Sequence, residues 1–168
     1  MNEIQVIAKK LDQAIIKSRL NSLAQMMMTD RAERLNCIAS VLSKLEPGAY
    51  LVGTGPSTVG IIALTVETVV LGRWATPVEK PADTVVDYEV DDTVYLGPYE
   101  VSRVHAKVSR KQDGAGQEFS ICDMGSRCGT FVNDEAVGPD GEGRVLCPGD
   151  VISLGSSRIS TYLFVVIE

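Results

Sequence analysis

Apolar residues near the start of the chain recur at every third or fourth position. One set is Ile4, Ile7, Leu11 and Ile15, and a second set is Leu35, Ile38, Leu42 and Leu45. This spacing places each set on one face of a helix, so it predicts two amphipathic helices, a helical hairpin forming an N-terminal extension over residues 1–46. Thr29 and Asp30 are suited to cap the second helix, and Pro47-Gly48 is suited to end it.

After Gly48 the pattern changes to short β-branched runs separated by turn residues. Many short runs at this spacing predict a mainly β domain over residues 48–168, built as a sandwich or a barrel. The predicted strands are Ala49 to Val52, Val59 to Val66, Thr68 to Leu71, Val104 to Val108, Phe119 to Ile121, Thr130 to Val132, Val151 to Leu154 and Ile159 to Ile167. The acidic, proline-containing stretch 74–92 predicts a long loop with one strand at Thr84 to Val86.

Composition and charge restrict the classes of partner. With 168 residues, 45% of them hydrophobic, the chain is long enough for one medium domain and a smaller appendage. The formal net charge of -6 argues against nucleic acid and anionic membranes, which are bound mainly through Lys and Arg. No stretch approaches the roughly 18 apolar residues of a membrane-spanning helix, and the first residues lack the order of a signal peptide. We therefore expect a cytoplasmic protein.

The cysteines and the single histidine lie far apart in the sequence. They are Cys37, Cys122, Cys128, Cys147 and His105. There is no CxxC pair, and the spacing fits no zinc pattern. We expect free thiols, with no metal and no cofactor, and a disulfide or a metal site is the alternative.

Three segments carry groups suited to binding a doubly charged anion: Gly72-Arg73, Ser102 to Ala106, and Asp123 to Asn133. Arg73 ends a predicted strand, so its guanidinium can offer two parallel N–H donors to phosphate oxygens. Ser102 opens a predicted strand, where we expect both its hydroxyl and its backbone N–H to donate. Two aspartates, at positions 123 and 150, are expected to close turns by bonding backbone amides. No nucleophile with a base accompanies them, so the chain is not predicted to be an enzyme.

The order and spacing of these segments resemble the forkhead-associated (FHA) domain family. The shared motifs are Gly72-Arg73, Ser-Arg-x-His-Ala from Ser102, Asp-x-Gly-Ser-x-x-Gly-Thr-Phe-Val-Asn from Asp123, and Pro-Gly-Asp-x-Ile-x-Leu-Gly from Pro148. The resemblance implies a two-sheet β-sandwich over residues 48–168. It also implies a non-enzymatic adaptor in signalling that binds threonine-phosphorylated proteins or peptides, with a Ser/Thr kinase or a kinase substrate as the expected partner.

The resemblance also assigns roles to individual residues. The implied phosphopeptide-binding residues are Arg73, Ser102, Arg103, Arg127 and Cys128. The implied loop-shaping residues are Gly72, His105, Gly125, Gly129, Thr130 and Asn133. His105 is expected to bond neighbouring backbone behind the loop rather than the ligand. A pocket that admits the threonine methyl implies a preference for phosphothreonine over phosphoserine.

The chain departs from the family pattern in two places. Arg127 and Cys128 stand where the family usually has Ser or Thr followed by Asn. Because a thiol is a poor hydrogen-bonding group, Cys128 is expected to weaken the hold on the peptide backbone, whereas Arg127 is expected to add a phosphate contact. The stretch between Gly72 and Ser102 is longer than the family's usual loop, and the excess is acidic. It is either a selective element that disfavours acidic peptides or a plain solvated extension.

Two alternatives remain open at this point. The domain is either a phosphothreonine reader or a divergent FHA scaffold that makes phospho-independent protein contacts or self-assembles. The N-terminal helices either pack against the sandwich or form a homodimer or partner-docking element, because helices of this length are marginal in isolation. The sequence names neither the partner nor the pathway.

Overall fold

The computed structural model describes residues 31–55, 58, 60–73, 79–80, 83–90, 100–113, 116–139 and 143–168. The chain divides into two compact units, Met1–Leu45 and Glu46–Glu168. In the first unit the described element is helix α2, Arg31–Leu42. The other predicted helix and the predicted Thr29-Asp30 cap lie outside the described residues. Helix α2 ends before Leu45 because the next N–H groups close a tight turn, in which Leu45 donates to the carbonyl of Leu42 at 3.2 Å.

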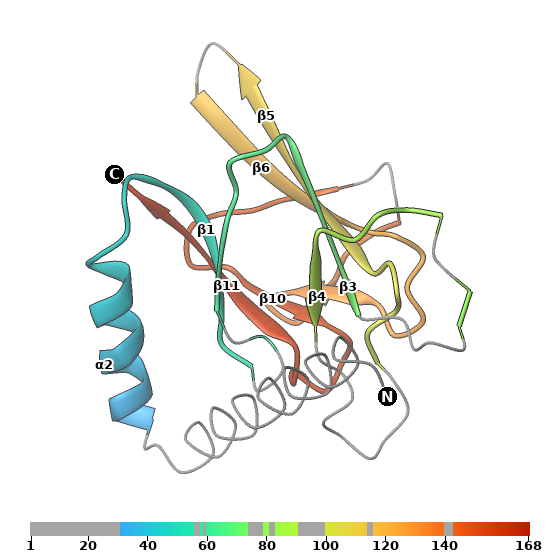
Figure 1. Ribbon diagram of the computed structural model, residues 1–168, viewed down its shortest axis with the longest axis horizontal. Coiled ribbons are helices and arrows are strands. Elements are labelled where there is room, and N and C mark those ends of the chain that lie inside the picture. The colour runs from blue at the N-terminus through green and yellow to red at the C-terminus, as the bar shows by residue number, and fades with distance from the viewer. Residues whose placement is uncertain are drawn as a thin grey trace, which may run out of the picture. The chain divides into compact units, whose positions relative to one another are not determined.

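The second unit is mainly β and contains two sheets (Figure 1). Its strands are β1 (Gly48–Gly53), β2 (Ile61–Ala63), β3 (Thr68–Arg73), β4 (Tyr88–Val90), β5 (Ala106–Asp113), β6 (Gly116–Asp123), β7 (Thr130–Val132), β8 (Glu135–Ala136), β9 (Arg144–Val145), β10 (Val151–Leu154) and β11 (Thr161–Ile167). One sheet has the order β2-β1-β11-β10-β7-β8, and the other has the order β4-β3-β5-β6-β9. This mainly β, two-sheet sandwich is the fold class that the sequence predicts.

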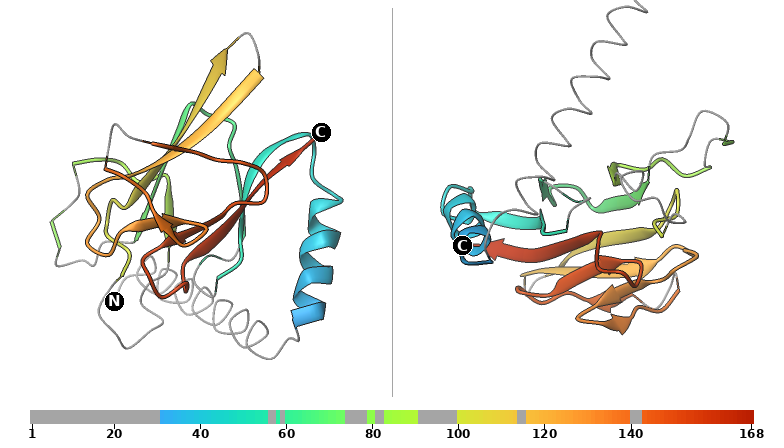
Figure 2. Two further views of the ribbon diagram at one scale, coloured as in Figure 1. Left: turned by 180° about the vertical axis from the view of Figure 1, so that it is seen from behind. Right: turned by 90° about the horizontal axis from the view of Figure 1, so that it is seen from below.

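The registers show how the ends of the domain are joined. Strand β1 pairs antiparallel with β11, with Gly48 opposite Ile167, so the first and last strands lie side by side. Strands β5 and β6 pair along their full lengths, from Ala106 opposite Asp123 to Asp113 opposite Gly116. Figure 2 shows this long hairpin extending beyond the neighbouring strands. The site described below lies at its other end, where β5 begins and β6 ends.

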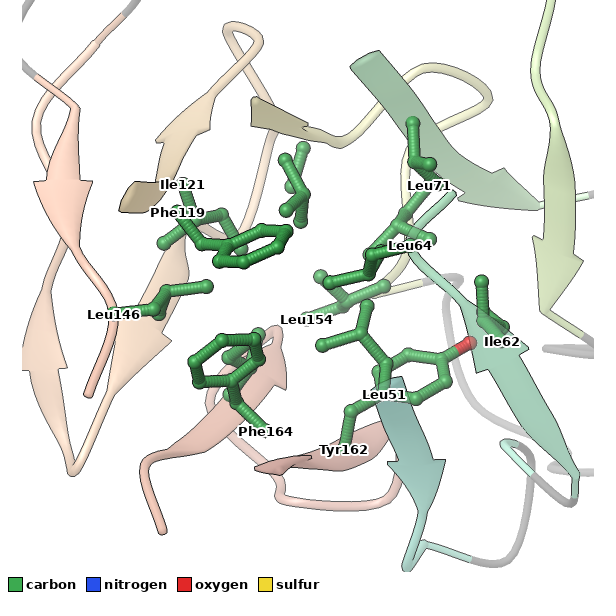
Figure 3. Packing of buried hydrophobic residues seen from close by; sticks show 14 of the residues in the cluster. Leu51, Ile62, Leu64, Leu71, Phe119, Ile121, Leu146, Leu154, Tyr162 and Phe164 are labelled. Carbon is green, nitrogen blue, oxygen red and sulfur yellow. The ribbon is translucent and has the colours of Figure 1, made fainter. Parts of the chain in front are cut away.

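The core lies between the inner faces of the two sheets (Figure 3). Phe119 of β6 and Phe164 of β11 are 4% and 1% exposed, and their ring centroids lie 5.4 Å apart at a 53° tilt. Leu51, Ile121 and Ile152 are fully buried around them. Burial of this apolar surface is the main favourable contribution to folding.

No helix in the described part of the chain is long and apolar enough to cross a membrane.

The strand predicted at Thr84 to Val86 is wrong. The strand in this region is β4, Tyr88–Val90, which pairs parallel with β3. Val85 is β-branched but 81% exposed, whereas Val90 is 2% exposed. Pairing starts only after Asp87, whose Oδ2 accepts the N–H of Val70 at 2.7 Å and whose own N–H donates to the Val70 carbonyl at 3.0 Å.

The strand predicted from Val104 begins two residues later, at Ala106. Ser102 therefore lies in a loop and does not open a strand. The reason is local, because the N–H of Ser102 donates to the side chain of His105 and closes a turn at 2.9 Å. The two-residue strands β8 and β9 were not predicted, since pairs of residues carry no periodic signal.

Candidate functional site

The end of strand β3 fixes the first side of the site. The N–H of Arg73 donates to the carbonyl of Ser102 at 3.1 Å, and the N–H of His105 donates to the carbonyl of Leu71 at 2.9 Å. A Cβ atom at Gly72 would lie 1.9 Å from the carbonyl oxygen of Arg103. Only glycine therefore allows the loop before β5 to lie this close to β3.

His105 joins this loop to the loop after β6. Its side chain is fully buried, and its Nδ1 accepts the N–H of Ser102 at 2.9 Å. Because Nδ1 accepts, Nε2 carries the proton and donates to the carbonyl of Gly129 at 3.0 Å. The imidazole thus bonds backbone at both nitrogens. The expectation that the Ser102 N–H is available to a ligand is wrong, because His105 already accepts it.

The Ser102 hydroxyl makes the third connection between the loops. Its oxygen accepts the backbone N–H of Arg127 at 3.0 Å. A hydroxyl can accept and donate at the same time, so the Ser102 proton remains able to point toward an anion. The structure therefore brings the backbones of Arg73, Ser102 and Arg127 together, around the start of β5 and the end of β6. Figure 1 shows where these strand ends lie.

Asp123 holds the shape of the loop between β6 and β7. Its Oδ2 accepts the N–H of Ser126 at 2.8 Å, and its Oδ1 accepts the hydroxyls of Ser126 at 2.5 Å and Thr130 at 2.7 Å. The Ser126 oxygen in turn accepts the N–H of Gly129 at 2.9 Å. Burial raises the pKa of the Asp123 carboxyl, but the donors from Ser126 and Thr130 outweigh burial, so its pKa lies below the ordinary 3.8.

The lowered pKa of Asp123 predicts an acid-sensitive loop. The ionised carboxylate stabilises the folded state fully above the unfolded value of 3.8, and this contribution is lost as pH falls through the lower folded-state pKa. We expect the wild-type protein to lose more stability than Asp123→Asn between pH 6 and pH 3, as measured by urea midpoints. Equal losses in the two proteins would contradict this role.

The remaining loop-shaping residues divide into two groups. Gly125 and Gly129 have φ of 71° and 78°, values that favour glycine. Thr130 is fully buried, and its hydroxyl donates to Asp123. Asn133 lies elsewhere, in the turn between β7 and β8, where its Oδ1 accepts the N–H of Val151 at 2.9 Å. Its Nδ2 donates to Asp150 at 2.7 Å. Asn133 thus joins the turn after β7 to the start of β10 and is not one of the residues that shape the loops around Ser102.

Asp150 closes a turn as predicted, because its Oδ2 accepts the N–H of Cys147 at 2.8 Å. The cysteines whose side chains are described, Cys122, Cys128 and Cys147, are free thiols. Cys128 is half-buried beside the exposed Arg127. Within the described residues no group of three His, Cys, Asp or Glu side chains could hold a metal ion.

Sequence reasoning missed one pair of contacts at the site. Both terminal nitrogens of Arg73 donate to the carboxylate of Glu79, Nη1 to Oε2 at 2.9 Å and Nη2 to Oε1 at 2.7 Å. Arg103 donates through Nη1 to the backbone carbonyl of Lys80. The two arginines nearest the end of β3 are therefore already bonded to adjacent residues of the acidic insertion. The only sequence signal was a glutamate six residues after Arg73.

The structure is a two-sheet β-sandwich whose loops are joined by hydrogen bonds at one end. The FHA domain family profile matches residues 69–155, just over half of the chain, and the chain belongs to the forkhead-associated family. The family is one of binding modules and not of enzymes.

Two curated proteins share part of the sequence. Protein FraH of a Nostoc species is 38% identical over 85 residues, and the glycogen accumulation regulator GarA of Mycolicibacterium smegmatis is 36% identical over 69 residues. These alignments cover 51% and 41% of this chain, but only 27% of FraH and 39% of GarA.

Solved structures share the fold. The MEK1 FHA domain, crystallised in complex with a phosphothreonine peptide of HOP1, superposes with a TM-score of 0.50 at 20% identity. The superposition covers 73% of this chain and all of that domain. At this identity the similarity establishes the fold of the sandwich alone.

Proposed function

We propose that this domain binds a threonine-phosphorylated protein or peptide through the loops around Ser102. The observation that carries the proposal is the convergence of Arg73, Ser102 and Arg127 on one end of the sandwich. The backbone N–H groups of all three residues are hydrogen-bonded, which fixes the loops that carry them. Loops that are already positioned lose little conformational entropy when a ligand binds, which favours recognition of a small group such as a phosphate.

Each of these residues has a distinct part in the proposed site. Arg73 offers two parallel N–H donors, which match two phosphate oxygens in a charge-assisted geometry. Ser102 donates its hydroxyl proton, because its oxygen is already oriented by the N–H of Arg127. The exposed Arg127 side chain supplies a further positive charge next to it. Arg103 lies one residue after Ser102 and adds a fourth donor group.

The preference for phosphothreonine over phosphoserine is an extension of the same proposal, and it rests on the family resemblance. Cys128 next to Arg127 limits the hold on the peptide backbone, because a thiol replaces the usual amide. We therefore propose a modest affinity that depends mainly on the phosphate. The partner is a protein carrying the phosphate mark of a Ser/Thr kinase, or the kinase itself.

The proposed setting is a non-enzymatic adaptor in signalling. The name of GarA, a glycogen accumulation regulator that matches part of this sequence, supports a regulatory role. The N-terminal helices are proposed to serve as a homodimerisation or partner-docking element. A cytoplasmic location stays a prediction.

One observation favours a second function. Arg73 is bonded to Glu79 at both terminal nitrogens, and Cys128 replaces an amide, so a sandwich that has lost its phosphate ligand would look similar. Such a scaffold would make phospho-independent protein contacts. The two functions differ in one respect that is simple to measure, which is whether phosphatase treatment of the partner prevents its capture.

The proposal is tested by fluorescence anisotropy with a degenerate phosphothreonine peptide library. We expect binding to the phosphothreonine library, weaker binding to the matched phosphoserine library and no binding to the unphosphorylated library. Equal binding to the phosphorylated and unphosphorylated libraries would support the scaffold function instead. No binding to any library at high protein concentration, by the wild-type protein and by a variant that lacks the Glu79 carboxylate, would overturn phosphopeptide recognition.

Single substitutions at the loop test the individual contacts. Ser102→Ala removes one hydrogen bond to a charged ligand, so we expect about tenfold weaker phosphopeptide binding. Arg127→Ala removes an exposed charge, and we expect a smaller loss of about three- to tenfold. Arg110→Ala is the matched control, because Arg110 lies along β5 opposite Phe119, away from the loops. If Arg127→Ala binds as tightly as Arg110→Ala, Arg127 makes no phosphate contact.

A further inference from the structure

The ion pair between Arg73 and Glu79 lies inside the proposed phosphate site. The guanidinium and the carboxylate face each other through two N–H···O bonds of 2.9 and 2.7 Å. The Arg73 side chain is only 10% exposed, and that of Glu79 is 30% exposed. The two donors that a phosphate would need are therefore engaged by a side chain of the same domain.

The neighbouring residue makes a second contact of the same kind. The backbone carbonyl of Lys80 accepts Nη1 of Arg103. Arg103 directly follows Ser102, the residue whose hydroxyl we propose for phosphate binding. Residues 79–80 therefore engage two of the arginines of the proposed site at once, one through a carboxylate and one through a carbonyl.

A carboxylate and a phosphate make the same demand on an arginine, because each presents two oxygens to the parallel N–H donors of the guanidinium. We propose that Glu79 is an internal substitute for the ligand phosphate, which a phosphothreonine must displace from Arg73. This inference rests on the proposed function and adds to it an autoinhibitory contact. It also gives the acidic insertion a specific role that its composition does not reveal.

Physical chemistry predicts the direction of the competition. Glu79 is six positions from Arg73, so it is tethered and acts at a high effective concentration. Glu79 nevertheless carries only a single negative charge, and because its side chain is 30% exposed, its ion pair with Arg73 is weaker than a fully buried pair. A phosphothreonine carries about -1.5 to -2 charges at pH 7 and has three acceptor oxygens. It can therefore displace Glu79, while a singly charged Asp or Glu of a peptide gains nothing by the exchange.

This competition would act as a filter for specificity. The phosphorylated ligand binds more weakly than it would to a vacant arginine, and acidic unphosphorylated peptides are rejected most strongly. The opposite effect is expected if Glu79 instead orients Arg73 for the ligand, because its removal would then weaken binding. The sign of the change in affinity separates the two roles.

The experiment compares Glu79→Gln with the wild-type protein by anisotropy, using the phosphothreonine library as the probe. Glu79→Gln removes the charge while keeping the size of the side chain, and we expect about three- to tenfold tighter binding. Glu79→Asp keeps the charge but shortens the reach to Arg73, so it should also tighten binding. Asp83→Asn is the matched control, because it removes one exposed charge from the same insertion, and it should change the affinity less than twofold.

The outcomes separate this inference from the proposed function. If the wild-type protein binds the library and Glu79→Gln binds it equally well or more weakly, Glu79 does not compete with the ligand phosphate. The inference is then overturned, while the proposed phosphopeptide binding stands. If only Glu79→Gln binds, the internal contact blocks the site outright and the inference is supported. If neither protein binds, both the proposed function and the inference fail. Thermal unfolding of each variant shows whether the fold is retained.

Discussion

Arg73→Ala is expected to abolish measurable phosphate-dependent binding. The side chain is 10% exposed and is the donor group of the site that is best positioned for a bidentate contact. Removing one partner from a buried, hydrogen-bonded charge pair typically costs about 2 to 5 kcal/mol, so we expect at least about 30-fold weaker binding. The measurement is anisotropy with the phosphothreonine library.

Two controls make this result interpretable. Arg73→Lys retains the positive charge but loses the planar fork of donors, so it should bind more tightly than Arg73→Ala and more weakly than the wild-type protein. Arg110→Ala should bind normally. Since Arg73 also pairs with Glu79, the thermal unfolding of each variant must stay close to that of the wild type. If a folded Arg73→Ala protein binds as tightly as the wild type, the phosphate site does not include Arg73 at the end of β3.

Asp123→Ala is expected to lower the free energy of unfolding by about 3 kcal/mol. The carboxylate is the acceptor for the N–H and hydroxyl of Ser126 and for the hydroxyl of Thr130. Thr130 is fully buried, so its hydroxyl cannot turn to water when the carboxylate is removed. Urea denaturation measures the loss through the change in midpoint at constant slope.

Asp123→Asn serves as the matched variant for this prediction. The amide has nearly the same shape and retains one carbonyl oxygen, but its NH2 group cannot accept the N–H of Ser126. We expect its loss of stability to lie between those of the wild type and Asp123→Ala. Surface substitutions usually change the free energy of unfolding by no more than about 0.5 kcal/mol. If the free energy of unfolding of Asp123→Ala lies within that range of the wild-type value, the carboxylate does not organise the loop.

The frame of the site could be predicted from the sequence because the order and spacing of its residues resemble the FHA family. Gly72 is required by the close approach of Arg103, and His105 is the single histidine, placed one residue before β5. Asp123 followed by Ser126 and Thr130 is a pattern suited to an aspartate-closed loop. The order of these residues carries the resemblance to the FHA family, and that resemblance predicted the two-sheet sandwich and the loop-shaping residues.

Other features depend on contacts that no local pattern contains. Thr84 to Val86 is β-branched, yet pairing begins only after Asp87, because its backbone and side chain both bond Val70. The N–H of Ser102 donates to His105 and is therefore not available to a ligand, and this contact depends on the rotamer of one imidazole. The pairing of Arg73 with Glu79 depends on the path of the insertion in space, which its acidic composition does not specify.

The most direct test of phosphothreonine recognition is an NMR titration of the isotopically labelled protein with N-acetyl-phosphothreonine methylamide. This probe needs no knowledge of the partner, and the matching threonine compound is its control. We expect phosphate-dependent shifts to concentrate on the amides of Ser102, Arg103 and Arg127, with little change along the far end of the β5–β6 hairpin. No phosphate-dependent shifts at these amides, or shifts centred on another part of the sandwich, would contradict the proposed site.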